Sequence, residues 1–75
     1  MPAMRESTSK LLAEAIRRER LRRHKTQIDV ARELRVNQAW VSRIELGETG
    51  LKVDDYMKVA KVVGFNPCKL LRAVY

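Results

Sequence analysis

The segment from Thr26 to Gly47, TQIDVARELRVNQAWVSRIELG, limits the possible folds of this chain most strongly. Two groups of apolar residues in it follow the spacing of helical stripes: Val30, Ala31 and Leu34, and then Val41 and Ile44. Thr26 is suited to cap the start of a helix, and Gly47 is suited to end one in the left-handed conformation. We therefore predict two short helices over residues 27–46, joined by a tight turn that contains Val36.

The second predicted helix carries polar side chains between its apolar positions. These residues, with one small residue among them, are Asn37, Gln38, Ala39, Ser42 and Arg43. The polar groups match the donors and acceptors of base edges, and a small residue allows the backbone to approach a base pair closely. A solvated helix face is the alternative interpretation. Because the rest of the segment also fits, we interpret residues 26–47 as a helix-turn-helix whose second helix reads DNA.

These residues resemble the Cro/repressor (XRE-type) helix-turn-helix family over about residues 11–71. The similarity rests on Thr26-Gln27, Ala31, Leu34-x-Val36, Val41-Ser42-Arg43-Ile44-Glu45-x-Gly47, Leu51-x-Val53 and Val59-Ala60-x-x-x-Gly64. Two positions depart from the pattern. Arg35 stands at the bend, where the family often has Gly, and His24-Lys25 stands where the family often has Gly and a hydrophobic residue. A left-handed conformation at Arg35 costs about 1 kcal/mol relative to Gly.

The resemblance implies a DNA-contacting surface. It implies base contacts from Asn37, Gln38, Ala39, Ser42 and Arg43, and a phosphate contact from Gln27. Beyond the resemblance, we expect phosphate contacts from Lys25, Thr26, Trp40 and Lys52. Gln27 is also expected to brace Gln38. For Trp40 the main interpretation is packing against the loop after Gly47, and contact with a sugar-phosphate strand or a thymine methyl group is the alternative. The family pattern further pairs Arg20 with Glu45 as a structural ion pair between the first and third helices.

The remaining segments predict three more helices. We expect residues 1–6 to form a flexible arm, followed by a helix that starts at Ser7 or Ser9 and ends near Arg23. A fourth helix is expected over residues 53–63, with Gly64 as its stop. Its apolar residues are Val53, Met57, Val59, Ala60 and Val63. A fifth helix is expected to start at Pro67 with Asn66 as its cap. The prediction is an all-α, compact five-helix repressor-like domain that occupies residues 1–75 as a single unit.

The charge of the chain is unevenly distributed. The net charge is +7 at pH 7, yet residues 26–50 carry three basic and four acidic side chains. Residues 1–25 carry eight basic and three acidic side chains, and residues 51–75 carry five and two. The basic cluster before residue 26 has three interpretations: a solvated face, phosphate contacts, or contact with an acidic protein or an anionic membrane surface.

The last predicted helix, over residues 67–75, is apolar on more than one side. Its apolar residues are Leu70, Leu71, Val74 and Tyr75. Successive residues on a helix diverge by about 100°, so these side chains cannot all face one small core. We expect them to form a homodimer interface, and a roughly palindromic operator would match such a dimer. The competing interpretation is that Leu70 and Leu71 complete the core.

Several other classes of protein are disfavoured. One His and one Cys, far apart in the sequence, do not form a nucleophile–base pair or a zinc site, so we expect no enzymatic activity, metal or cofactor. The single Cys68 excludes an internal disulfide and favours a reducing compartment. No apolar run approaches the length of a membrane span, and the first ten residues lack the apolar stretch of a signal peptide. We therefore expect a cytoplasmic, nucleoid-associated protein without a membrane partner.

The functional prediction is a homodimeric transcriptional regulator that binds double-stranded DNA sequence-specifically. The alternative is an antitoxin-type module that neutralises a partner protein, such as a toxin, and autoregulates its operon. In that case the basic cluster before residue 26 would bind the protein partner.

Overall fold

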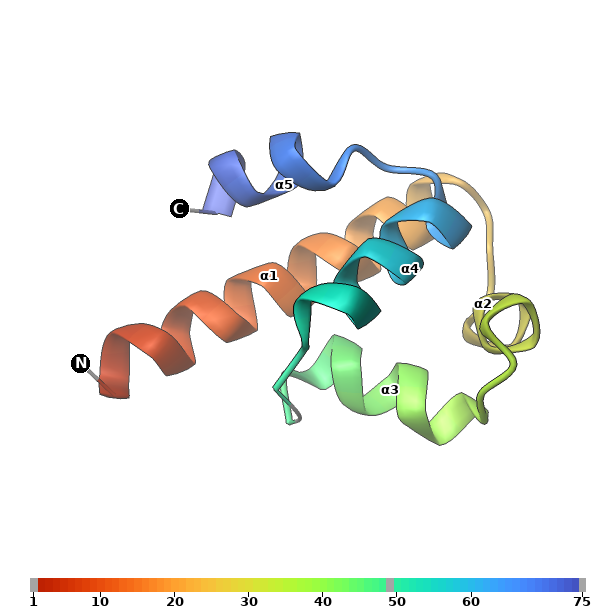
Figure 1. Ribbon diagram of the computed structural model, residues 1–75, viewed down its shortest axis with the longest axis horizontal. Coiled ribbons are helices and arrows are strands. Elements are labelled where there is room, and N and C mark those ends of the chain that lie inside the picture. Colours follow the sequence, from red (N-terminus) through yellow and green to blue (C-terminus); the bar gives the residue numbers. More distant parts are fainter. Residues whose placement is uncertain (1, 49, 75) are drawn as a thin grey trace.

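Helix α1 is the longest element, and the other helices are arranged around it (Figure 1). The computed structural model describes residues 2–48 and 50–74, with side chains from Lys10 onward. The helices are α1 (Pro2–Arg22), α2 (Gln27–Leu34), α3 (Gln38–Leu46), α4 (Val53–Val63) and α5 (Pro67–Val74). Within the described ranges every regular element is helical, which confirms the expected all-α, five-helix fold.

The core lies where four of the helices meet. Helix α1 packs against α3, α4 and α5, while α2 packs against α3 and α4. The buried cluster consists of Ile16, Val30, Ala31, Val41, Ile44, Tyr56, Val59, Ala60, Val63 and Phe65. This packing holds α2 and α3 as one unit on the side of α1 opposite α5 (Figure 1).

Local side-chain contacts fix both ends of the turn between α2 and α3. Thr26 caps α2 in a capping box with Asp29, in which each side chain accepts a hydrogen bond from the backbone N–H of the other residue. Asn37 caps α3, and its Oδ1 accepts from the backbone N–H of Trp40 at 3.0 Å. Gly47 ends α3 with a φ of 73°. These caps satisfy backbone groups that helix ends leave without partners.

Two non-glycine residues adopt the left-handed conformation within the described part of the chain. His24 has a φ of 57° and follows α1, and Arg35 has a φ of 60° and follows α2. Both lie at the positions where the sequence departs from the glycines of the XRE-type pattern. The left-handed conformation costs a non-glycine residue about 1–2 kcal/mol, so the helix-turn-helix forms here despite two strained residues.

The expected start of the first helix was wrong. Helix α1 begins at Pro2 rather than at Ser7 or Ser9, so residues 2–6 of the expected arm belong to the helix. Proline is favoured at the first helical position because its φ already suits a helix and its missing N–H would have no partner there. Ala3 and Met4, which follow it, have high helix propensity.

The expected inner stripe of α4 was also wrong at two positions. Val53 is 76% exposed and Met57 is 50% exposed. Val59, Ala60 and Val63 are buried as expected, and Tyr56 joins them; the spacing of three and four residues places all four on one face. Met57 follows Tyr56 and therefore points about 100° away from that face.

Tyr56 also joins α4 to α5. Its hydroxyl donates a hydrogen bond of 2.6 Å to the backbone carbonyl of Pro67. Burial of the ring raises the pKa of Tyr56 above its ordinary value, because the charged phenolate is disfavoured away from water. The hydroxyl therefore stays protonated and keeps donating to α5 throughout the neutral range.

Candidate nucleic-acid interface

Helix α3 presents an exposed face on the side away from the core. Ala39, Arg43 and Leu46 are exposed, while Val41 and Ile44 on the opposite face are buried. Residues three and four positions apart share a helix face, so the three exposed residues form one row. Ser42 lies half-buried at the edge of this row. The row offers a guanidinium, an aliphatic side chain and a small residue to whatever lies against α3.

Leu46, which is 61% exposed, was not among the residues that we expected at this surface. Its place could have been derived from the sequence, because it lies three residues after Arg43 and seven after Ala39 and therefore falls on their face. An exposed leucine in this row offers an apolar contact such as that with a thymine methyl group.

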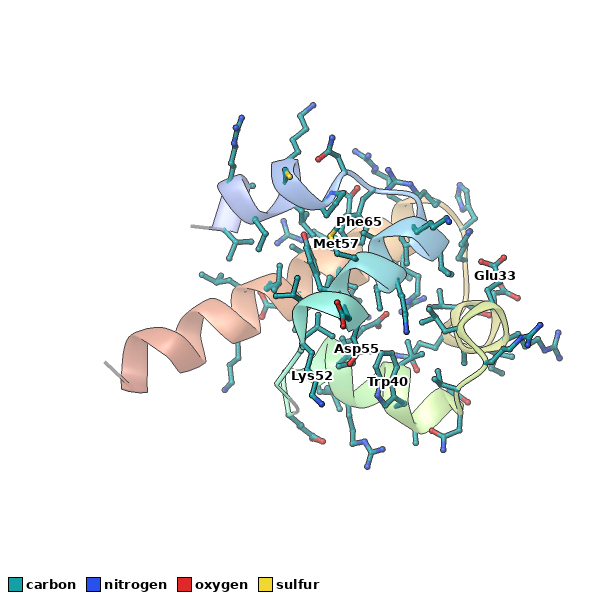
Figure 2. All side chains as sticks on the ribbon, viewed as in Figure 1. Glu33, Trp40, Lys52, Asp55, Met57 and Phe65 are labelled. Carbon is teal, nitrogen blue, oxygen red and sulfur yellow. The ribbon has the colours of Figure 1, made fainter. Side chains whose placement is uncertain are left out.

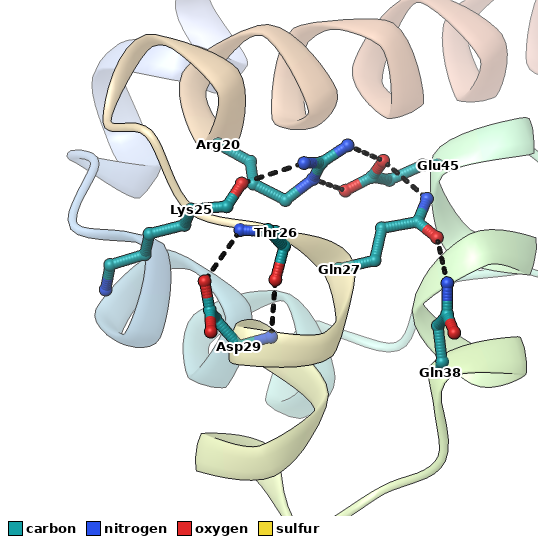
Figure 3. A network of polar contacts seen from close by, with 7 residues as sticks. All are labelled: Arg20, Lys25, Thr26, Gln27, Asp29, Gln38 and Glu45. Atoms are coloured by element: carbon teal, nitrogen blue, oxygen red, sulfur yellow. Dashed lines mark hydrogen bonds and ion pairs between the residues drawn. The ribbon is translucent and has the colours of Figure 1, made fainter.

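A buried ion pair anchors α3 to α1 behind this face. The Arg20 guanidinium donates two hydrogen bonds to the Glu45 carboxylate, at 2.6 and 2.9 Å (Figure 3). A third hydrogen bond, of 2.8 Å, runs from Arg20 to the backbone carbonyl of Lys25, just before α2. Arg20 thus connects three segments: α1, the link to α2, and α3.

The network continues from this pair to the surface through two amide side chains. Gln27 at the start of α2 donates to Glu45 Oε1 at 3.0 Å, and its own Oε1 accepts from Gln38 Nε2 at 3.3 Å (Figure 3). A carboxylate paired with arginine only accepts hydrogen bonds, so Gln27 must turn its nitrogen toward Glu45 and its oxygen toward Gln38. Gln38 then donates one N–H to Gln27 and keeps its oxygen and its second N–H for an outside partner.

The capping residues Thr26 and Asn37 each use a side-chain oxygen to accept the hydrogen bond of the cap. Asn37 uses Oδ1 for the cap of α3, which leaves its amide nitrogen as the group that can donate outward. Thr26 uses Oγ1 for the cap of α2. Hydrogen bonds with the backbone N–H and then the side chain of Thr26 hold the pKa of Asp29 below its ordinary value, so the carboxylate stays charged in this cap at neutral pH. Both caps lie at the end of α2 or α3 that borders the exposed row.

The structure separates the remaining three residues that we expected to contact phosphates. Trp40 is half-buried and packs against the hydrophobic core, while its remaining surface stays open. Lys52 is exposed directly before α4, and Figure 2 shows it with Trp40 on the side of the molecule occupied by α3. Lys25 is used elsewhere: its ammonium donates to the Val62 carbonyl and lies 3.7 Å from the Glu33 carboxylate. We therefore do not retain Lys25 in the interface.

The residues that we expected at a dimer interface fall into two separate grooves. Leu71 lines a groove of about 320 Å³ with Val53 and Met57, whereas Leu70 and Val74 line another of about 310 Å³ against α1. Leu70 and Leu71 also pack against the core, as the competing interpretation expects. Tyr75 lies outside the described residues.

The described residues, 2–48 and 50–74, contain neither a cluster of metal-binding side chains nor a membrane-spanning helix. In these ranges, no three side chains of His, Cys, Asp or Glu lie close enough together to hold a metal ion. None of the described helices combines the length and the apolar composition that crossing a bilayer requires.

Comparison with known proteins gives one match. A family model described as a helix-turn-helix domain matches residues 11–73, which include α2 to α5 almost completely and the second half of α1. No curated protein and no solved structure matches the chain.

Proposed function

Since this chain belongs to the helix-turn-helix domain family, we propose that it is a transcriptional regulator that binds double-stranded DNA sequence-specifically. Helix α3 enters the major groove, as the second helix of this motif does, with its N-terminal residues at the base edges. Gln38 and Arg43 carry most of the sequence preference. Asn37, Ala39 and Ser42 complete the base-facing surface.

The hydrogen-bonded chain from Arg20 through Glu45 and Gln27 to Gln38 carries this proposal. A glutamine that reads adenine uses its oxygen and one N–H together, against N6 and N7. Gln38 has this pair of groups available, and Gln27 restricts the orientation of its amide. An ordinary surface glutamine would lose rotamer entropy on binding, whereas Gln38 is already partly ordered. Arg43, on the exposed row, suits guanine O6 and N7.

Contacts to the DNA backbone come from the residues around this face. We assign phosphate or sugar contacts to Thr26, Gln27, Trp40 and Lys52. Such contacts fix the position of the protein on the duplex without reading the sequence. Among them Lys52 alone is charged, so the electrostatic part of these phosphate contacts depends mainly on Lys52.

We further propose that the regulator acts as a homodimer. A single short helix that contacts a few base pairs discriminates poorly, and two copies on adjacent half-sites multiply the selectivity. The contact between copies is best assigned to the groove lined by Leu12, Leu51, Val53, Tyr56, Met57, Pro67, Cys68 and Leu71. All eight residues are uncharged, which matters because two chains that each carry a net charge of +7 repel one another. The exposed Val53 and Met57 provide apolar surface that a copy would cover.

In vitro selection of bound DNA from a random library, with the intact protein, tests this function. We expect enrichment of a palindrome whose half-sites lie about 10–10.5 base pairs apart, which is one helical turn. Recovery of a single half-site without a repeat would contradict the dimer. Absence of any enriched sequence, despite salt-sensitive binding to the library, would contradict sequence-specific regulation.

A further inference from the structure

Two adjoining pockets lie between α1 and α5 and together form a groove. Helix α5 lies on the side of α1 away from α3 (Figure 1). The two parts of the groove have volumes of about 310 and 360 Å³ and share Glu19, Leu70 and Ala73 in their walls. Helices α3 and α5 both pack against α1 but not against each other in the described residues. The groove is therefore separated from the proposed DNA-reading face by the thickness of α1.

One part of the groove lining, here called the floor, consists of apolar residues. Leu11, Ala15, Leu70, Ala73 and Val74 line it. Leu11 is 48% exposed, and Leu70 and Val74 are half-buried, so each still offers apolar surface to a ligand. A groove with such a floor gains stability when apolar side chains of a partner displace its water.

The rim of the groove is basic. Arg18, Arg22, Arg23 and Lys69 line the two parts, against a single carboxylate, that of Glu19. This carboxylate lies 2.7 Å from Arg23 and 3.4 Å from Arg22, so it already has cationic neighbours on the same helix. Four cations and one anion leave the rim with a positive charge that favours carboxylates on a partner.

We propose that the groove between α1 and α5 binds an acidic amphipathic helix of a partner protein. The apolar face of such a helix would cover Leu11, Leu70 and Val74, and its acidic flank would meet Arg18, Arg22 and Lys69. Helix-in-groove recognition of this kind uses apolar anchors three and four residues apart. The eight residues of α5 span about 12 Å, which corresponds to a little over two turns of the bound helix.

A second copy of this chain is a poor occupant, because its net charge of +7 opposes a basic rim. Duplex DNA, the other polyanion to consider, gains nothing from an apolar floor. The site also explains why so much basic charge lies outside residues 26–50, the nearly neutral segment that contains the proposed reading helix. This inference does not depend on the proposed DNA-binding function, and both ligands could be bound at once.

The first experiment tests the apolar floor. The probe is a fluorescent 16-residue synthetic peptide with leucines at helical spacing on one face and glutamates beside them, and its control is a scrambled peptide of the same composition. Fluorescence anisotropy with the intact protein should show tighter binding of the amphipathic peptide. Leu11→Asp should weaken this binding at least tenfold. Leu21→Asp is the matched control, because Leu21 is 45% exposed on α1 but does not line the groove.

The second experiment tests the basic rim. The double variant Arg18→Glu/Arg22→Glu should weaken peptide binding at least tenfold. Its affinity for duplex DNA should stay within about twofold of that of a control double variant, Lys58→Glu/Lys61→Glu. The latter pair changes the net charge equally on exposed residues of α4, so it corrects for non-specific attraction. If the melting temperature of the Glu variants is lowered, the variant Arg18→Gln/Arg22→Gln allows peptide and DNA affinities to be compared with a smaller change of charge.

Three results would overturn the inference. The first is equal binding of the amphipathic and scrambled peptides. The second is an equal effect of Leu11→Asp and Leu21→Asp. The third is a loss of duplex DNA affinity without a loss of peptide affinity in the Arg18/Arg22 variant, which would make the rim a phosphate-binding surface. A failure of DNA selection, in contrast, would leave the peptide result unaffected, so the two proposals can fail separately.

Discussion

Arg20 of α1 and Glu45 of α3 share two hydrogen bonds, and their side chains are only 8% and 3% exposed. The pair lies beneath the exposed row of α3, and Gln27 and Gln38 extend it to the surface. The contact that stabilises the domain is therefore also the contact that orients its proposed reading residue.

We predict that Glu45→Gln destabilises the fold by about 3–5 kcal/mol, because it leaves the buried Arg20 charge without its counter-charge. Urea or thermal unfolding measures the change. Replacement of both partners, Arg20→Met with Glu45→Leu, should recover much of the stability, since buried ion pairs are often replaceable by apolar residues of similar volume. An unchanged unfolding midpoint in Glu45→Gln would contradict the buried pairing.

Gln38→Ala should weaken binding to the selected operator by about 1–3 kcal/mol and have a much smaller effect on random DNA. Gln27→Ala should also reduce operator affinity, but less so when Gln38 is already Ala, because part of its effect passes through Gln38. A double-mutant cycle on both DNAs measures this coupling. Equal losses on operator and random DNA would mean that Gln38 positions the protein and does not read a base.

The salt dependence of binding should separate the two basic regions. Lys52→Gln should reduce the slope of log affinity against log salt by about 0.9 per protomer, since each phosphate contact releases counterions in that proportion. Arg22→Gln, on the far side of α1, should leave the slope unchanged. A titration of duplex DNA at four or more salt concentrations gives both slopes. A lower slope for Arg22→Gln alone would mean that the basic residues of α1, and not Lys52, contact phosphates.

Met57→Glu should turn the dimer into a monomer without unfolding it, because Met57 is 50% exposed and lines the uncharged groove beside α5. Light scattering measures the mass, and a titration with the full palindrome measures the accompanying loss of affinity. Leu21→Glu, at similar exposure on α1, is the control. Unchanged mass in Met57→Glu would contradict this interface and move the search to other exposed apolar surface away from α3.

Arg35→Gly should raise the melting temperature by a few degrees. The left-handed conformation at φ 60° costs a non-glycine residue about 1–2 kcal/mol, and the greater freedom of glycine in the unfolded chain offsets about 0.5–1 kcal/mol of that gain. Arg35→Ala removes the same charge and keeps the strain, so it should not stabilise. If both variants melt at the same temperature, the strain at this turn is negligible.

Much of the fold could be predicted from the sequence because its signals are local. The caps Thr26 and Asn66, the stop at Gly64 and the apolar spacing of α2 and α3 each depend on a few neighbouring residues. The expectation for α1 failed because two local signals compete: Ser7 and Ser9 suit a helix cap, but Pro2, which suits the first helical position, lies before them. The error in α4 arose from choosing Met57 rather than Tyr56 for the stripe, and both are compatible with a core.

The candidate site was less accessible from the sequence, since it depends on contacts between distant segments. Lys25 was expected at a phosphate because of its charge, but its side chain reaches the carbonyl of Val62, 37 residues away. The ion pair of Arg20 and Glu45 could be anticipated only from the family pattern, because nothing local links two residues 25 positions apart. The division of Leu70 and Leu71 between two grooves follows from how α5 lies on its neighbours, which apolar spacing alone does not determine.

The hydrogen-bonded chain beneath α3 has a consequence for how this protein could evolve new target sites. Gln38 is tied to Gln27 and through it to a buried carboxylate, so a mutation of Gln38 disturbs a network that reaches the core. Ala39, Arg43 and Leu46 are exposed and lie outside that network, so mutation can vary them with little loss of stability. Descendants of this protein would therefore diversify their operators first at these three positions, while the base pair read by Gln38 stayed fixed.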